Sequence, residues 1–270
     1  MKPWKCLAVI MVVLFCGCGR EEPPQLTAPT TAVTETVTEA VTEAVTETVT
    51  ETVTLPATTE PAPLHSPLYI PGISVEDVIT YFNEVCLDAE IINSGNPSLL
   101  QKWSQPICYT IHGAYTQEDL QIFTEYLQWL NTIEGFPGIM EASDPLYTNL
   151  DIHFCTQTDM LSLMGDHFIG TDGAVTFWYD NNAIYNAIIC YRTELDQQTR
   201  NSVILEEIYN GLGPIQDTSL RPDSIIYSGF STPQELTEID QLLLKLLYHP
   251  DMQCGMNAAD CETIIRQLYY

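Results

Sequence analysis

The chain has 270 residues, with 36 Asp and Glu against nine Lys and Arg, and its formal net charge is −27. A chain this acidic lacks the clustered cations that binding to nucleic-acid phosphates requires, which excludes nucleic acid as a partner. Residues 73–270 alone carry six Lys and Arg against 28 Asp and Glu, a net charge of −22, so this part of the protein would also repel anionic lipid.

Residues 1–17 have the proportions of a signal peptide. Lys2 and Lys5 precede an apolar run of about twelve residues, which is too short to remain as a membrane-spanning helix. The run ends in "LFCGC", which resembles the lipobox of bacterial lipoproteins. We expect lipid attachment at Cys18, with Cys16 as the lesser candidate and an ordinary secretory cleavage nearby as the other reading. The protein would then be exported and held at the membrane by its lipid, with its domain outside the cytoplasm.

Residues 18–72 are predicted to form a disordered tether. Five Val-Thr-Glu-Thr or Val-Thr-Glu-Ala repeats occupy residues 33–52, and prolines recur from Pro56 to Pro71. A low-complexity segment of this kind cannot bury enough apolar surface to offset the entropy of ordering it. One globular domain is therefore expected, over residues 73–270.

The cysteines of this domain indicate disulfide bonds. Six is an even number, which in an exported domain permits up to three disulfides, and Cys254 and Cys261 are close enough in sequence to pair. No C-x-x-C spacing occurs, so a structural zinc site is not expected. The six are Cys86, Cys108, Cys155, Cys190, Cys254 and Cys261.

Hydrophobic spacing predicts the elements of the domain in chain order. Helices are expected at residues 74–89, 116–135, 158–165, 199–212, 232–248 and 257–270. Strands are expected at residues 106–113, 149–156, 174–180 and 183–193, the last two as neighbours across a turn. Ser74, Thr116 and Thr232 are the predicted helix caps. Because these elements do not alternate strictly, the expected fold class is α+β with a small, mainly antiparallel sheet.

The stretch "VILEEIYNGLGPIQD" at residues 203–217 matches the frame of a zinc-peptidase helix without its histidines. In H-E-x-x-H-x-x-G-x-x-H sites, imidazoles bind the metal and the Glu serves as general base. Here Glu207 takes the general-base place and Gly213 the Gly place, whereas the three His places hold Glu206, Asn210 and Gln216. Such a ligand set suits zinc poorly. A helix that merely packs its apolar residues is the other interpretation, and no metal or cofactor is expected.

Residues 200–257 resemble a bacterial family of exported proteins of unknown function that is related by pattern to zincin-like metallopeptidases. The resemblance rests on Glu206-Glu207, Leu212-Gly213, Asp217, Ser224-Ile225, Leu236-Thr237 with Asp240, Leu247-Tyr248-His249-Pro250 and Gly255-Met256. It implies a zincin-like domain in which "SIIY" (224–227) forms a turn beneath the site. Asn210 and Pro214 depart from the family pattern, which has Gln and Leu at these places.

Two functional hypotheses follow. The first is a surface lipoprotein whose zincin-like domain, a pseudo-enzyme, binds a protein or a glycan through residues such as Asn210, Gln216 and Asp217. The second is a working hydrolase that uses Glu206 or Glu207 as its base; a purely structural surface domain is a third reading. The histidines His112, His153, His167 and His249 are scattered in the sequence. We interpret His153 as a residue of a strand face and give His167 the best chance of approaching a site.

Overall fold

The computed structural model describes residues 8–10, 66–87, 99–229 and 231–270. Cys16, Cys18 and the repeats at 33–52 lie outside these residues, so lipid attachment and the disordered tether stay predictions. In the described part of the chain, every helix is too short or too polar to cross a lipid bilayer.

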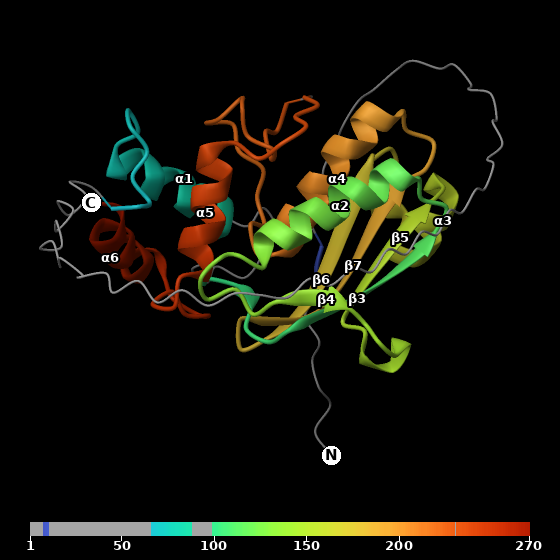
Figure 1. The fold of residues 1–270 in the computed structure, drawn as a ribbon, viewed down its shortest axis with the longest axis horizontal. Coiled ribbons are helices and arrows are strands. Elements are labelled where there is room, and N and C mark those ends of the chain that lie inside the picture. Colours follow the sequence, from blue (N-terminus) through green and yellow to red (C-terminus); the bar gives the residue numbers. More distant parts are fainter. Residues whose placement is uncertain (1–7, 11–65, 88–98, 230) are drawn as a thin grey trace, which may run out of the picture. The chain divides into compact units, whose positions relative to one another are not determined.

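A single mixed sheet forms the centre of the fold (Figure 1). The order along it is β1-β6-β7-β5-β3-β4, and β2 pairs with β7 outside this path. The strands are β1 (Ala8–Ile10), β2 (Lys102–Trp103), β3 (Ile107–Gly113), β4 (Ile139–Glu141), β5 (Leu150–Cys155), β6 (Gly173–Asp180) and β7 (Ala183–Arg192). Strand β1 lies within the predicted signal peptide and pairs antiparallel with β6.

The sheet is mainly parallel, so the predicted small, mainly antiparallel sheet and the zincin-like α+β class are wrong. Strand β7 runs parallel to β2 and β5, and β3 runs parallel to β4 and β5. Among the strands that the structure describes, only β6–β7 and β1–β6 pair antiparallel. Parallel neighbours need a crossover connection, and the helix after β3 supplies one. The fold class is therefore α/β.

The sequence correctly predicts strands β3 and β5 and, with its pairing, the hairpin of β6 and β7. The two strands pair antiparallel from Gly173↔Tyr191 to Asp180↔Ala183. Between them, Asn181 and Asn182 adopt positive φ values of 50° and 63°. Asn tolerates this left-handed conformation better than most residues, which is why it favours tight hairpin turns.

Within residues 66–87, 99–229 and 231–270, six α-helices accompany the sheet, and all six predicted helices are found. They are α1 (Val75–Leu87), α2 (Gln117–Leu130), α3 (Gln157–Met164), α4 (Gln197–Gly211), α5 (Glu238–Tyr248) and α6 (Ala258–Tyr269). Thr116 caps α2 in a capping box with Asp119, as predicted. The predicted cap Thr232 is wrong: α5 begins six residues later, where Thr237 and Asp240 form the capping box.

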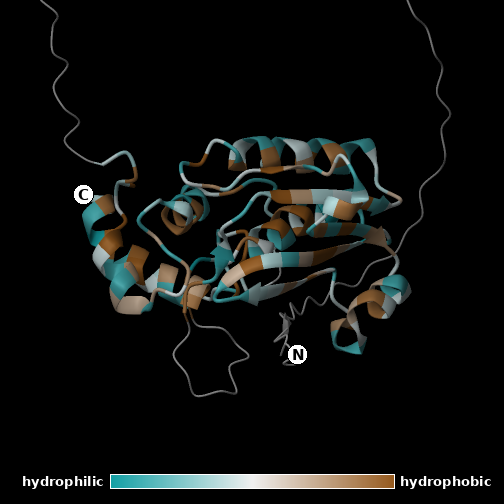
Figure 2. Ribbon diagram, turned by 90° about the horizontal axis from the view of Figure 1, so that it is seen from below, coloured by the Kyte–Doolittle hydropathy of each residue, from teal (hydrophilic) through white to brown (hydrophobic). Residues whose placement is uncertain are grey.

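The helices lie on both sides of the sheet (Figure 2). Strand β5 alternates strictly, so Leu150, Ile152 and Phe154 are buried on the face covered by α2 and α4. On the opposite face α3 buries Met160 against β6 and β7. Helices α1, α5 and α6 gather at one end of the sheet (Figure 1).

The segment just before α1 contacts the last helix of the chain. The Tyr269 hydroxyl, on α6, has two backbone oxygens within hydrogen-bond distance, that of Ile70 at 3.1 Å and that of Ile73 at 3.0 Å. The Ser66 hydroxyl donates to the backbone oxygen of Leu268. Residues 66–72, which the predicted boundary assigns to the tether, are thus attached to the folded part.

The described part of the chain contains no disulfide bond, which contradicts the predicted disulfides. Two cysteine pairs nevertheless lie close together as thiols. Cys155 of β5 and Cys190 of β7 lie on adjacent strands, and the interaction of their side chains lowers the pKa of the Cys155 thiol. Burial beside Cys261 raises the pKa of the Cys86 thiol well above its usual range. The free cysteines are Cys86, Cys108, Cys155, Cys190, Cys254 and Cys261.

Candidate functional site

Helix α4, which carries the predicted site, is enclosed on all sides. Every residue from Arg200 to Gly211 is buried. The exposed fractions of Glu206 and Glu207 are 3% and 1%, and Asn210 is fully buried. The helix is therefore a central core element, and its acidic residues are not a solvated face.

The end of α4 is fixed by contacts from distant elements. The Trp103 indole donates to the backbone oxygen of Gly211 at 2.9 Å, and the Tyr248 hydroxyl donates to that of Leu212 at 2.7 Å. Gly213 adopts φ 128°, and a Cβ at this position would lie 2.4 Å from the backbone oxygen of Gln101. Glycine is therefore required at the Gly place of the peptidase pattern by backbone geometry, independently of any metal.

Glu206 and Glu207 are buried near two further carboxyl groups, those of Asp217 and Asp172. Burial raises the pKa of both well above the usual range, and the charges of Asp217 and Asp172 raise both further. The charge of Glu207 also raises the pKa of Glu206. Burial and the neighbouring carboxyl groups thus favour the protonated, neutral form of both glutamates.

Asp172, which the sequence analysis did not single out, is the residue directly before β6. The next residue, Gly173, touches the Glu207 side chain: a Cβ there would lie 2.7 Å from Glu207 Cγ and Oε1. The absence of a side chain at Gly173 is what lets α4 approach the sheet at this point. The sequence "TDGA" shows only a turn before a strand, so this contact has no local signal.

Several polar atoms of the predicted site lack hydrogen-bond partners among the described residues. They are Glu206 Oε1, Glu207 Oε2, both side-chain polar atoms of Asn210 and Gln216 Oε1. Such groups are costly when buried, so they mark a strained or functional position. The structure brings Glu206, Glu207 and Asp217 within electrostatic reach of one another, and it buries Asn210 and the Gln216 oxygen as well.

The Ser224–Tyr227 turn forms hydrogen bonds with Asp240 in the first turn of α5. The Ser224 hydroxyl donates to Asp240 Oδ1 at 2.6 Å, and the Ile225 amide donates to Asp240 Oδ2 at 3.2 Å. The Tyr81 hydroxyl completes this buried network at 2.8 Å from the Ser224 oxygen. Ser224-Ile225 and Asp240, two parts of the family-like pattern, therefore have a structural explanation.

Two further parts of the family-like pattern, at Leu247 and at Gly255-Met256, contact β2 and the residue Leu100 just before it. Lys102 Nζ donates to the backbone oxygens of Leu247 at 2.8 Å and Met252 at 2.6 Å. Burial lowers the pKa of Lys102 to about 8. Gly255 and Met256 exchange backbone hydrogen bonds with Leu100 at 2.8 and 2.9 Å.

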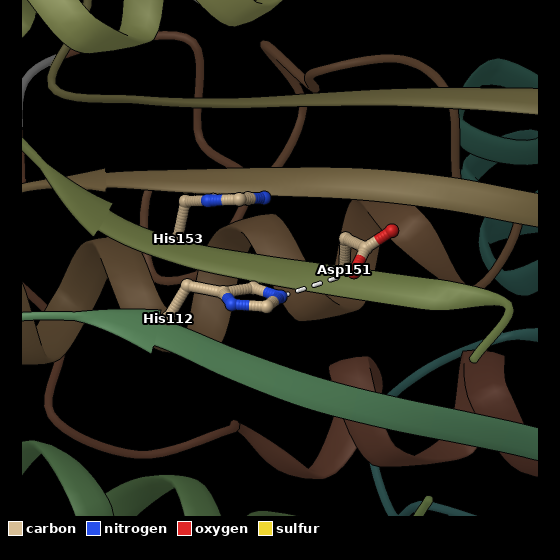
Figure 3. Close-up of side chains that lie close together, drawn as sticks. All are labelled: His112, Asp151 and His153. Atoms are coloured by element: carbon tan, nitrogen blue, oxygen red, sulfur yellow. Dashed lines mark hydrogen bonds and ion pairs between the residues drawn. The ribbon is translucent and has the colours of Figure 1, made fainter. Parts of the chain in front are cut away.

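A second polar cluster lies on the open face of the sheet and was not predicted (Figure 3). His112 of β3 and His153 of β5 are direct cross-strand partners, and Asp151 lies two residues before His153 on the same face. The two imidazole rings stack with centroids 4.6 Å apart, and His112 Nε2 lies 3.2 Å from Asp151 Oδ1. One ligand atom from each residue falls within 4.8 Å of the others, a grouping found at no other His, Cys, Asp or Glu set in the described residues.

One imidazole of this cluster, that of His153, is held toward its neutral form, in which a ring nitrogen can bind a ligand. Burial and the charge of His112 lower the pKa of His153, while Asp151 opposes this effect. Two charged rings stacked this closely would repel each other, so the neutral form of His153 fits the geometry. Two imidazoles and one carboxylate are ligands that suit divalent transition metals.

A cleft of about 200 Å³ opens on the other side of the sheet, between α2, α4 and residues 234–241. Trp129 and Tyr126 of α2 stack beside it with ring centroids 6.0 Å apart. Polar side chains complete the wall of the cleft. Its lining residues are Ile122, Glu125, Tyr126, Trp129, Leu205, Gln234, Glu235, Leu236 and Gln241.

Sequence reasoning missed these two surface sites because both depend on pairing between distant segments. The strand endings "TIHG" and "DIHF" each contain Ile-His, and this repeated pair was the one available signal for the cluster. His167, the favoured histidine, instead lies against Phe168, with ring centroids 4.5 Å apart.

Comparison with known proteins is consistent with the motif-based resemblance and adds no link to zincin metallopeptidases. A search of curated proteins and a search of solved structures each returned no match. A family model described as a protein of unknown function (DUF2927) matches residues 75–267, which is nearly the whole folded part. The chain belongs to the DUF2927 family.

Proposed function

We propose that the protein is an exported, lipid-anchored binding protein that recognises a neutral sugar in the cleft beside Trp129. The observation that carries the proposal is the lining of this cleft: a half-buried indole stands beside the amides of Gln234 and Gln241 and the carboxyl groups of Glu125 and Glu235. An aromatic ring offers a flat apolar surface to the C–H face of a sugar. Amide and carboxyl groups offer partners to its hydroxyls.

The size and charge of the cleft narrow the ligand class. Its volume of about 200 Å³ is below the ~300–1,000 Å³ of pockets that enclose a whole ligand. It therefore fits one ring at the end of a chain better than a complete oligosaccharide. Glu125 and Glu235 add negative charge to a strongly acidic domain, so an anionic sugar would be repelled and a neutral one accepted.

The state of Glu206 and Glu207 supports binding over hydrolysis. A general base must come within hydrogen-bond reach of the proton it removes. These two carboxyl groups are enclosed in the core, and burial together with the neighbouring carboxyl groups raises their pKa values, which favours the protonated form. The alternative, a hydrolase that uses either residue as its base, would require both solvent access and ionisation.

The N-terminal pattern supports the cellular setting of the proposal. A short apolar run followed by Cys18 favours export and lipid attachment, and the Thr- and Glu-rich residues after it would separate the domain from the membrane. A domain held outside the cytoplasm in this way would meet glycans of its own or neighbouring surfaces.

The test measures the binding of neutral mono- and oligosaccharides to the full chain in detergent by saturation-transfer difference NMR. We expect Trp129→Ala to weaken binding about tenfold, the equivalent of ~1.4 kcal/mol for a lost aromatic contact. Trp178→Ala is the matched control, because this half-buried indole of β6 is not among the residues that line the cleft. Equal binding by the wild type and the Trp129 variant, or no binding by any neutral saccharide, would exclude the proposal.

A further inference from the structure

We propose that His112, Asp151 and His153 form a binding site for a divalent late transition-metal ion such as Zn²⁺, Cu²⁺ or Ni²⁺. The site lies on the sheet face opposite α2 and α4, so it is separate from the sugar cleft and does not depend on it. Its occupant is inferred from the side chains and their arrangement alone.

The strand register creates the site. In a parallel pair, cross-strand neighbours on the same face stand about 4.8 Å apart, which is the spacing that places His112 beside His153. Asp151 shares their face because side chains alternate along β5, and its carboxylate reaches back to His112 at 3.2 Å. Two adjacent, hydrogen-bonded strands thus hold all three ligands (Figure 3).

The distances fit an ion after a small side-chain movement. Ligands of tetrahedral zinc at about 2.0–2.1 Å from the metal lie roughly 3.3 Å from one another. The His112–Asp151 separation of 3.2 Å already meets this, and the three ligand atoms lie within 4.8 Å. The nearly parallel rings, with an interplanar angle of 20°, must rotate before both nitrogens face one ion. Metal binding is therefore expected to break the imidazole stack.

The exposure of the site indicates an open metal centre. The side chains of His112 and Asp151 are 45% and 39% exposed, and His153 is half-buried. Three protein ligands leave at least one coordination position for water or another molecule, unlike closed structural sites with four protein ligands. A solvent-facing ion of this kind can be exchanged or delivered, which suits acquisition or sensing of metal by a surface protein.

The donor atoms select the class of metal. Two imidazole nitrogens and one carboxylate oxygen favour nickel, copper and zinc. Of these three ions, copper generally binds such ligands most tightly. Calcium and magnesium need six or more oxygen ligands, which this site does not supply. The strongly negative charge of the domain raises the local concentration of any divalent cation, but the nitrogen donors decide which one stays.

The experiment is zinc titration of the full chain, without a polyhistidine tag, by isothermal titration calorimetry. We expect one Zn²⁺ per chain, with affinity reduced at least 100-fold by His112→Ala or His153→Ala, since even outer-shell changes cost 10–100-fold. Asp151→Asn should give a smaller loss. The matched control is His249→Ala, because His249 also stands near a carboxylate, at 3.7 Å from Asp251, but has no second imidazole partner.

Two further readouts separate a real site from a general acidic surface. Zinc should raise the melting temperature of the wild type but not that of the His112→Ala/His153→Ala double variant, because only a bound ion stabilises the fold. Magnesium in excess should leave the zinc affinity unchanged. Equal zinc binding by the double variant and the wild type, displacement by magnesium, or no saturable binding would overturn the proposal.

Discussion

Glu206 and Glu207 determine a pH dependence of folding that is unusual for carboxyl groups. Their pKa values in the folded state lie well above the ordinary 4.5, so the folded chain binds more protons than the unfolded chain at pH values between 4.5 and the raised pKa values. Their contribution to stability is fully present below about pH 4.5 and is lost as the pH rises through the raised values.

Replacing both residues should therefore stabilise the fold at higher pH. In the Glu206→Gln/Glu207→Gln variant, the wild-type loss of stability between pH 5 and 8, up to about 1.4 kcal/mol per group and pH unit, should be reduced. Urea unfolding at both pH values measures this. Glu134→Gln is the control, because Glu134 is exposed. A double variant that is less stable than the wild type at pH 8 would show that the ionised carboxylates support the fold.

At the scale of elements, a buried ion pair connects α2 to α4. Arg200 Nε donates to Asp119 Oδ1 at 2.8 Å, and Asp119 has no exposed surface. Burial opposes ionisation of Asp119, but the hydrogen bonds from Arg200 and Thr116 outweigh it and lower its pKa. Its contribution to stability has the opposite sign to that of the two glutamates: it is present above about pH 4 and is lost as the pH falls through the lowered value.

Removing one partner of this pair should destabilise the fold strongly. Arg200→Ala leaves Asp119 buried without its cation, at an expected cost of about 3–5 kcal/mol in the free energy of unfolding. The control is Arg266→Ala, which removes exposed ion pairs with Glu76 and Glu262 and should cost about 0–1 kcal/mol. Chemical denaturation compares the two variants, and similar losses in both would contradict the structural role given to Arg200.

The elements that could be predicted from the sequence are those with local signals. Helix periodicity, the Thr116 capping box and the Asn181-Asn182 hairpin are encoded within a few residues of each other. The direction of the sheet is not, because β3, β5 and β7 become parallel neighbours only through crossovers over distant chain. The strands β2 and β4, with two and three residues, are too short to show a pattern.

The same limit applies to the sites. Glu206 and Glu207 were found because they are adjacent in a motif, whereas Asp172 joins them only through the approach of β6 to α4. The burial of Glu206 and Glu207 also could not be predicted. The sequence of α4 does not reveal that α2, the sheet and other neighbouring elements cover every side of this helix. The His112–Asp151–His153 cluster requires the exact register between two strands, which sequence spacing does not define.

At the scale of the whole molecule, lipid anchoring at Cys18 is the prediction that locates the domain at the membrane. Cys18→Ser should release the protein from the membrane fraction or block its processing, because the thiol that accepts the lipid is gone. Detergent phase partitioning of the wild type and the variant measures this. Cys16→Ser is the matched control and should partition as the wild type does. Retention of the Cys18 variant with its lipid would assign the anchor to a different residue.

If ligands bind in the cleft beside Trp129 and the α4 carboxyl groups are enclosed and inactive, mutations at the two places should have different effects on binding. Saccharide titration of the Glu206→Gln/Glu207→Gln variant and of Trp129→Ala by saturation-transfer difference NMR measures this difference. We expect wild-type affinity for the glutamine variant and about tenfold weaker binding for the Trp129 variant. Loss of binding in the glutamine variant, with full binding in the Trp129 variant, would instead place the binding function at α4.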